Sequence, residues 1–513
     1  MNKFWKRYLF KPYGTFCLSA CVALSACGGS GGSQTTAPPA PPPAAPPPSA
    51  KYVQPAAENL SISDVQNIIA QAAEEASARN MPAVIAVTDR VGNVLGVFRM
   101  NGLGVSTKIR SGNGTNTGLQ GVDVPHELAA IAKAITGAYL SSSGNAFSTR
   151  TASVILQQHF PPSSYTVGLE SGPLFGVQFS QLPCSDLSRR YLSGTNTLGP
   201  QRSPLGLSAD PGGLPLYKNG VVVGGIGISA DGDYGFDSES TNIDTDDEEL
   251  IAVAGAFGFA APISIRADRI NIDGTSLRYI DKDESDLSVN PANARSFSVI
   301  NGTLGSLVAV NGYFGATGLA IQAGLVYKTE LSGIRPSTTA EYLNPDIFVL
   351  TDGAGVNRYP PIAGTDLASV NAPLTQQEVR TILEEAFLVM TRSRSQIRRP
   401  LNSRAQVSIS IVDTYGAILG IVRSPDAPIF GTDVSLQKAR TAAFFSNPVA
   451  GTQLSNVTRS INFGGGANTQ IINRVSLLRS FLKDPNALTG KVAFSDRAGG
   501  NLSRPYFPDG EVG

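Results

Sequence analysis

Residues 87–99 read VTDRVGNVLGVFR, and residues 411–423 read IVDTYGAILGIVR. In each stretch, two runs of mainly β-branched and aliphatic residues flank a turn that contains a glycine, Gly92 or Gly416. This pattern predicts a β-hairpin. Gly96, inside the first return strand, predicts a bulge or a close approach of another part of the backbone. The two stretches therefore predict one kind of hairpin, written twice in the same chain.

The hairpin belongs to a longer repeat. Helical patterns precede it at 60–73 (LSISDVQNIIAQAA) and 374–387 (LTQQEVRTILEEAF), and others follow it at 132–142 (AKAITGAYLSS) and 437–447 (QKARTAAFFSN). Three segments in one order indicate a duplicated domain. The hairpin residues that are identical in both places are Asp89, Gly92, Leu95, Gly96 and Arg99, which match Asp413, Gly416, Leu419, Gly420 and Arg423.

The shared aspartates and the shared arginines differ in whether the hairpin itself explains the residue type. Asp89 and Asp413 open the turns, where an aspartate side chain binds nearby backbone amides, so we interpret them as structural. Arg99 and Arg423 have no such local reason. They are therefore candidates for binding a ligand.

The expected fold is an α/β sandwich, an antiparallel sheet flanked by helices, present twice. The second copy has no counterpart of GGLPLYKNGVVVGGIGIS (212–229), so we expect it to be incomplete, either truncated or degenerate. In 212–229, Asn219-Gly220 predicts a tight hairpin turn, and the glycine spacing does not match a dinucleotide-binding loop. The expected layout is a signal peptide (1–27), a Gly/Ser- and Pro-rich spacer (28–55), a first segment (56–264), a β-rich connecting region (265–372) and a second segment (373–513).

Composition places the chain among ordinary globular proteins. Of 513 residues, 42% are hydrophobic and 16% are charged, and the 40 basic side chains balance the 40 acidic ones. Such a balance gives no support to a nucleic-acid partner.

The N-terminus predicts export and a lipid anchor. Basic residues precede the apolar stretch FCLSACVALSAC (16–27), which is short for a membrane span. Leu24-Ser25-Ala26-Cys27 resembles the bacterial lipobox, so we expect lipidation of Cys27; a plain secretory peptide is the alternative. Gly28 after the cysteine favours, by resemblance, the outer membrane of a Gram-negative cell envelope. The Pro-rich residues 37–50 would then form a spacer of about 40 Å. Cys184 would be the one cysteine left in the mature chain, and we interpret it as structural.

The ordered set of hairpin, AKAITGA helix, glycine-rich hairpin and DEEL helix resembles the GlcG/HbpS family of haem-binding or haem-degrading domains. The resemblance covers about 60–260 and, less completely, 374–450. It implies a small α/β sandwich that often assembles into homo-oligomers. It also implies a haem cofactor or a related small-molecule ligand.

Haem requires an apolar slot, cations for its propionates and usually an axial ligand. The chain has two histidines, His159 and His126, which are the candidate axial ligands. Lys133 and Lys438 could meet propionates, with Thr136 and Thr441 one turn further along their helices. An exposed helix lysine surrounded by water is the simpler interpretation of Lys133 and Lys438.

No motif of a nucleophile, zinc site or phosphate loop is present, so we assign no catalytic residue. The function that we expect is a surface-tethered lipoprotein that binds haem or a related ligand. Two alternatives stay open, an enzyme acting on haem or a small hydroxy acid, and a non-catalytic module that forms oligomers.

Overall fold

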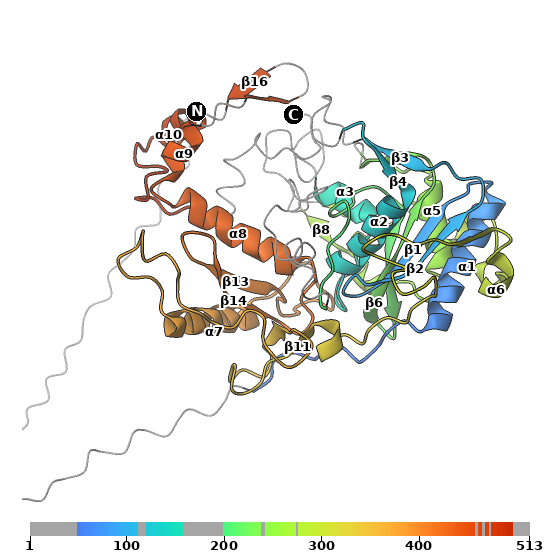
Figure 1. Ribbon diagram of the computed structural model, residues 1–513, viewed down its shortest axis with the longest axis horizontal. Coiled ribbons are helices and arrows are strands. Elements are labelled where there is room, and N and C mark those ends of the chain that lie inside the picture. The colour runs from blue at the N-terminus through green and yellow to red at the C-terminus, as the bar shows by residue number, and fades with distance from the viewer. Residues whose placement is uncertain are drawn as a thin grey trace, which may run out of the picture. The chain divides into compact units, whose positions relative to one another are not determined.

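The computed structural model describes residues 49–110, 120–156, 198–237, 242–272, 275–456, 460–463, 467–470 and 473–495 (Figure 1). These residues belong to one compact unit, Pro47–Gly513. The predicted signal peptide, Cys27, His159 and Cys184 lie outside the described residues. Within the described ranges, no helix is both long and apolar enough to span a membrane.

The first segment is built on a five-stranded sheet in which every pair of neighbouring strands is antiparallel. Both hairpins predicted in this segment are present, one as β1–β2 and the other as β5–β6. Asn219 and Gly220, with φ of 49° and 78°, form the tight turn of the second hairpin. The strand order is β10 (Gly305–Leu307), β2 (Val94–Met100), β1 (Val84–Asp89), β6 (Val221–Ser229) and β5 (Gly213–Lys218).

Of the two predicted roles of Gly96, the structure shows the bulge, while the atoms that approach this glycine belong to side chains and not to the backbone. Val87 pairs with Gly96 but Thr88 pairs with Val94, so Leu95 is the extra residue of a β-bulge. A Cβ on Gly96 would also lie 3.1 Å from Ile69 Cδ1. The bulge therefore lies where the strand passes close beneath helix α1 (Ile62–Ala78).

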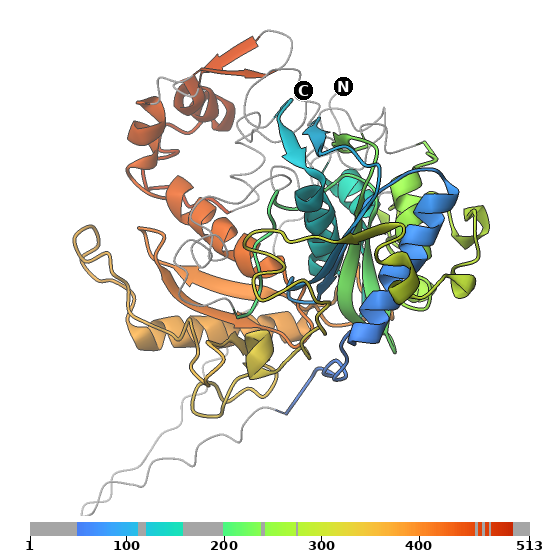
Figure 2. The same cartoon turned by 45° about the vertical axis from the view of Figure 1, so that its right-hand side comes forward.

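Helices cover both faces of this sheet, as the alternating apolar residues of β1 require. Ile85 and Val87 face a core shared with α1 and α5 (Asp247–Gly255), whereas Val84 and Ala86 face α2 (His126–Leu140). Figure 1 and Figure 2 show α1 and α2 on opposite sides of the strands. This arrangement confirms the predicted antiparallel sheet flanked by helices.

The glycines of β6 allow α2 to approach the sheet closely. A Cβ on Gly225 would lie 2.1 Å from the carbonyl oxygen of Ala134, and one on Gly227 would lie 2.1 Å from that of Ala130. Any larger residue would push the helix away. The glycine run therefore serves helix packing.

The second segment is built on a four-stranded sheet whose hairpin repeats the first. Ile411 pairs with Gly420 and Val412 with Ile418, so Leu419 is the bulged residue, as Leu95 is in the first hairpin. Helices α7 (Gln376–Arg392) and α8 (Gly431–Phe445) occupy the places of α1 and α2. β13 and β11 are the two edge strands of this sheet. The order is β11 (Ile334–Pro336), β12 (Phe348–Leu350), β14 (Ile418–Arg423) and β13 (Ser408–Val412).

The connecting region contributes short strands to both sheets. β10 pairs with β2, and β12 pairs with β14. Apart from these, most of the region is irregular or consists of single turns. The remaining helices and strands are β3 (Ser106–Ile109), β4 (Asp123–Pro125), α3 (Thr149–Ile155), β7 (Asp233–Tyr234), β8 (Asn271–Ile272), β9 (Thr275–Ser276), α6 (Phe297–Ile300), α9 (Ala450–Ser455), β15 (Ser460–Phe463), β16 (Ala467–Gln470) and α10 (Arg474–Leu482).

An apolar core joins the two segments. Ile131 and Tyr139 of α2 share it with Ile421 of β14 and Leu436 of α8, and the connecting region adds Phe348. The two hairpins therefore belong to one folded body, in which the α2 face of the first sheet is covered from the second segment.

Candidate functional site

Lys133 lies in a buried charged cluster against α2. Its side chain is 0% exposed, and its Nζ lies 2.5 Å from Asp210 Oδ2 and is also bonded to Glu248 Oε2. The expectation of an exposed, hydrated lysine is therefore wrong for Lys133. We call Lys133, Asp210 and Glu248 the lysine cluster.

Three elements position this cluster. Lys133 is on α2, Asp210 is in the loop before β5, and Glu248 is in the first turn of α5. The other oxygen of Glu248 accepts hydrogen bonds from the amides of Ala230 and Asp231, just after β6. The cluster thereby ties α2 and α5 to the end of the central hairpin.

Burial and mutual charge shift the protonation of all three groups. Burial alone would lower the pKa of Lys133, but Asp210 and Glu248 raise it above its ordinary value. Burial raises the pKa of Asp210 to about 6, although Lys133 opposes the shift. Burial likewise raises the pKa of Glu248 well above its ordinary range. One cation therefore faces two buried carboxyls, and burial raises the pKa of both carboxyls despite the ammonium beside them.

His126 begins α2 on the same side as the lysine cluster. Its ring is buried, at 1% exposure for the residue, and Nδ1 lies 2.8 Å from Ser229 Oγ at the end of β6. Burial and then the nearby Arg99 lower the pKa of His126, so the ring is neutral at pH 7. A neutral imidazole can ligate a metal through Nε2 while Nδ1 is held by the serine.

The arginines shared by the two hairpins have structural partners. Arg99 Nη1 pairs with Glu127 Oε1 at 2.5 Å, and Nη2 donates to the carbonyl groups of Leu103 and Gly104. Arg423 is 0% exposed and donates to backbone and hydroxyl oxygens of its own segment. Its acceptors are Ser408 Oγ at 3.1 Å, the carbonyl of Ala427 at 2.8 Å, and Thr432 Oγ1.

The threonines and the second lysine are placed differently in the two segments. Thr136 Oγ1 donates to the carbonyl of Ala132 at 2.7 Å and accepts from the Ser208 amide at 2.7 Å. On α8, Lys438 is exposed and Thr441 is half-buried. The structure therefore brings together Arg99, His126 and Lys133, and places Lys438 in a different environment from its counterpart.

Asp210 and Glu248 are the site residues that sequence reasoning missed. The sequence indicated Glu248 only as one of the acidic residues that begin the DEEL helix, and Asp210 lies in a loop without a recognisable motif. No local pattern links either residue to Lys133, which is 115 positions from Glu248 in the chain. Only the packing of α2 between β5, β6 and the start of α5 makes the connection.

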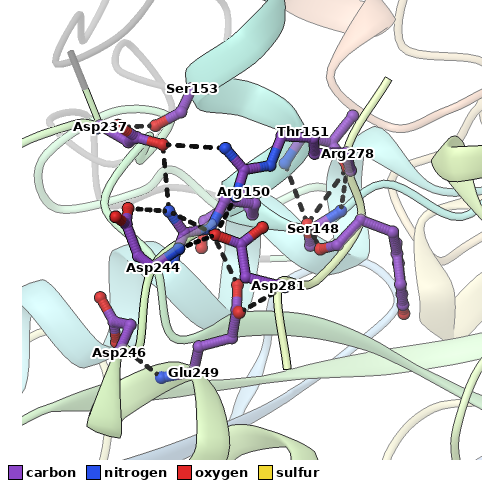
Figure 3. A network of polar contacts seen from close by, with 12 residues as sticks. Ser148, Arg150, Thr151, Ser153, Asp237, Asp244, Asp246, Glu249, Arg278 and Asp281 are labelled. Atoms are coloured by element: carbon purple, nitrogen blue, oxygen red, sulfur yellow. Dashed lines mark hydrogen bonds and ion pairs between the residues drawn. The ribbon is translucent and has the colours of Figure 1, made fainter. Parts of the chain in front are cut away.

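A second charged network joins the first segment to the connecting region (Figure 3). Buried Arg150 of α3 lies 3.1 Å from Glu249, 3.1 Å from Asp237, 3.0 Å from Asp244 and 3.4 Å from Asp281. Burial raises the pKa of Glu249 to about 7, although Arg150 opposes the shift. Over the part of the chain that the structure describes, no group of three or more His, Cys, Asp or Glu side chains is placed to hold a metal ion.

A cavity of about 750 Å³ lies in the second segment, between the β13–β14 turn and helices α8 and α9. Tyr415, Arg440 and Phe444 line it with neighbouring small and polar residues. None of the predicted ligand-binding residues lines this cavity. It is therefore separate from the site around α2.

Comparison with known proteins identifies the first segment. Residues 60–234 match the family model described as haem degrading protein HbpS-like. No curated protein matches the chain.

Several solved structures are similar to part of the chain. ORFY of Klebsiella pneumoniae is 19% identical, covers 41% of this chain and 96% of its own, and has a TM-score of 0.23. PduOC, solved as a haem complex, is 20% identical over 39% of this chain and 96% of its own, with a TM-score of 0.22. A double mutant of HbpS from Streptomyces reticuli is 18% identical over 43% of this chain and 98% of its own, with a TM-score of 0.20. The family match, together with the observed antiparallel sheet and flanking helices, shows that the chain carries an HbpS-like domain at residues 60–234.

Proposed function

We propose that the chain is a lipoprotein of the cell envelope whose HbpS-like domain binds haem or a chemically related small ligand. The match of residues 60–234 to a haem-degrading family carries the proposal. The basic and apolar N-terminus and the lipobox-like Leu24–Cys27 support export and anchoring to the outer membrane.

The residues predicted to hold haem do not fit it as a set. The Lys133 ammonium is paired with two carboxylates, and Arg99 is paired with Glu127, so neither offers an unpaired cation to a propionate. The Thr136 hydroxyl is also occupied. Of this group, His126 alone offers a ring nitrogen, Nε2. His159 lies outside the described residues.

Acid–base catalysis is the second candidate function, and the lysine cluster favours it. Asp210, with its pKa raised to about 6, exchanges a proton near neutral pH beside a permanently charged Lys133. Such a group suits an enzyme that acts on haem or a small hydroxy acid.

The duplicated hairpins and the edge position of β13 are consistent with the third alternative, a module that forms oligomers without catalysis.

Hemin titration of the purified full-length chain tests the proposal. We expect a saturable shift of the Soret band, and its absence overturns haem binding. His126→Ala and His159→Ala, measured side by side, separate the two candidate axial ligands because only the ligating residue should alter the spectrum. Loss of the Soret band on adding a reductant would favour the enzyme.

A further inference from the structure

Three buried arginines meet where the first and second segments join. Arg90 lies in the β1–β2 turn, Arg398 lies between α7 and β13, and Arg423 ends β14. They are 2%, 7% and 0% exposed. Arg90 Nη2 and Arg398 Nη2 each lie 2.7 Å from a different oxygen of the same carboxylate, Asp426. We call these four residues the junction cluster.

Asp426 is ionised and fully engaged. Burial alone would raise its pKa, but Arg90 and Arg398 lower it below its ordinary value. Besides the two arginines, its oxygens accept hydrogen bonds from the Ser143 amide at 3.0 and 3.2 Å and from the Ser143 hydroxyl at 3.3 Å. The carboxylate therefore has little capacity left for further donors.

The arginines have more donors than the surrounding chain has acceptors. Arg90 Nε and Nη1, Arg398 Nε and Arg423 Nε are buried without a hydrogen-bond partner. The Tyr327 ring lies 3.7 Å from the Arg90 guanidinium carbon and covers one face of that group. A ring face attracts a cation but gives its N–H groups no acceptor in their plane.

The charges do not balance either. Three guanidinium cations and one carboxylate leave two positive charges, and Asp426 is the one carboxylate that pairs with these arginines among the described residues. Burial lowers the pKa of Arg423, although the Tyr327 side chain opposes the shift through its charge and a hydrogen bond. A water molecule would supply acceptors but no charge, and buried charges are normally paired.

We propose that the junction cluster binds a small inorganic anion of the size of chloride, held by unpartnered N–H groups of Arg90 with Arg398 or Arg423. The packed positions of Tyr327 and Asp426 around Arg90 favour a small ion over a larger organic anion. This site is separate from the HbpS-like site around α2. It joins the hairpin turn of the first segment to the end of β14, so the anion stabilises the contact between the two segments.

The test uses the full-length chain at constant ionic strength, with sodium chloride replacing sodium gluconate. We expect the melting temperature to rise with chloride concentration. Above the dissociation constant, each tenfold increase in chloride raises the folded-to-unfolded ratio about tenfold. The NMR line width of the chloride nucleus should also broaden with the native protein and recover on unfolding. An unchanged melting temperature together with unchanged line width would overturn the proposal.

Two variants sharpen the test. Arg90→Met removes a proposed ligand, and we expect the chloride dependence of the melting temperature to disappear. Arg335→Met is the matched control, because Arg335 is also buried but is balanced by Glu330 and Glu341. It should retain the chloride response of the unmodified chain, and loss of the response in this control would contradict the assignment to Arg90. If Arg90→Met does not fold, the line width of the unmodified chain still decides the outcome.

Discussion

Replacing Lys133 with methionine removes the one cation of the lysine cluster while keeping a long apolar side chain. Asp210 and Glu248 would then be two buried carboxyls without a counter-charge. Removing one partner of a buried ion pair typically costs about 3–5 kcal/mol of stability. We expect a loss of that order near neutral pH.

The loss should depend on pH in a defined direction. In the unmodified chain the pKa of Asp210 is raised to about 6, above its unfolded value, so the folded state binds the extra proton below that pH. Ionisation of Asp210 therefore lowers the free energy of unfolding as pH rises toward 6, and its contribution to this decline ends above its folded pKa. In Lys133→Met, Asp210 has lost its counter-charge and keeps its proton to a higher pH, so the free energy of unfolding continues to fall above pH 6. Above the folded pKa of Asp210 in the unmodified chain, the difference in the free energy of unfolding between Lys133→Met and the unmodified chain should grow by about 1.4 kcal/mol per pH unit.

Urea denaturation followed by circular dichroism, at about pH 6 and about pH 8, measures this difference. Lys438→Met is the control, since Lys438 holds the equivalent position on α8 but is exposed. It should change stability by less than about 0.5 kcal/mol at either pH. Equal losses at the two pH values, or an equal loss in the control, would refute the proposed role of the lysine cluster.

Three further changes probe other parts of the structure. Gly227→Ala should destabilise the fold by about 1–3 kcal/mol or more, because its Cβ would meet backbone atoms of α2. Gly104→Ala is the control and should be neutral, because no atom lies within 4 Å of a Cβ at this position. Thermal denaturation compares the two variants. Asp89→Ala and Asp413→Ala should each cost about 1–3 kcal/mol because each carboxylate accepts two turn amides, and unequal urea midpoint shifts would show that the turns are not energetically equivalent. The folded pKa of Glu249 is about 7 and exceeds its unfolded pKa, so protonation of Glu249 stabilises the fold and this stabilisation is lost as pH rises toward 7. Glu249→Gln should therefore flatten the decline in melting temperature over this pH range. An unchanged dependence of the melting temperature on pH would contradict this.

The hairpins and helices were predictable because their signals are local. The turn at Asn219-Gly220, the bulge at Gly96 and the apolar period of α1 each depend on neighbours a few residues apart, and all three are observed. The pairing of β10 with β2 and of β12 with β14 was not predicted. These strands are three residues long and come from the connecting region, where no alternation is long enough to indicate a partner.

The arginines that the two hairpins share show that the sequence does not predict the partners of a side chain. Arg99 and Arg423 match in the hairpin, yet Arg99 pairs with Glu127 at the start of α2, whereas Arg423 is buried at the junction between segments. The shared residue type reflects the shared strand end. The function of each side chain depends on which other element packs against it.

The sequence by itself determined the secondary structure, the duplicated hairpin and the antiparallel sheet with flanking helices, because periodicity and turn chemistry act over short distances. Tertiary structure alone decided the charge environment. Lys133 and Lys438 occupy the same place in two similar helices, but α5 brings Glu248 onto the first, while the second is exposed. Arg90 and Asp426 meet across 336 positions for the same reason. Packing of elements distant in the chain, and the desolvation that packing imposes, set the protonation and pairing of these groups.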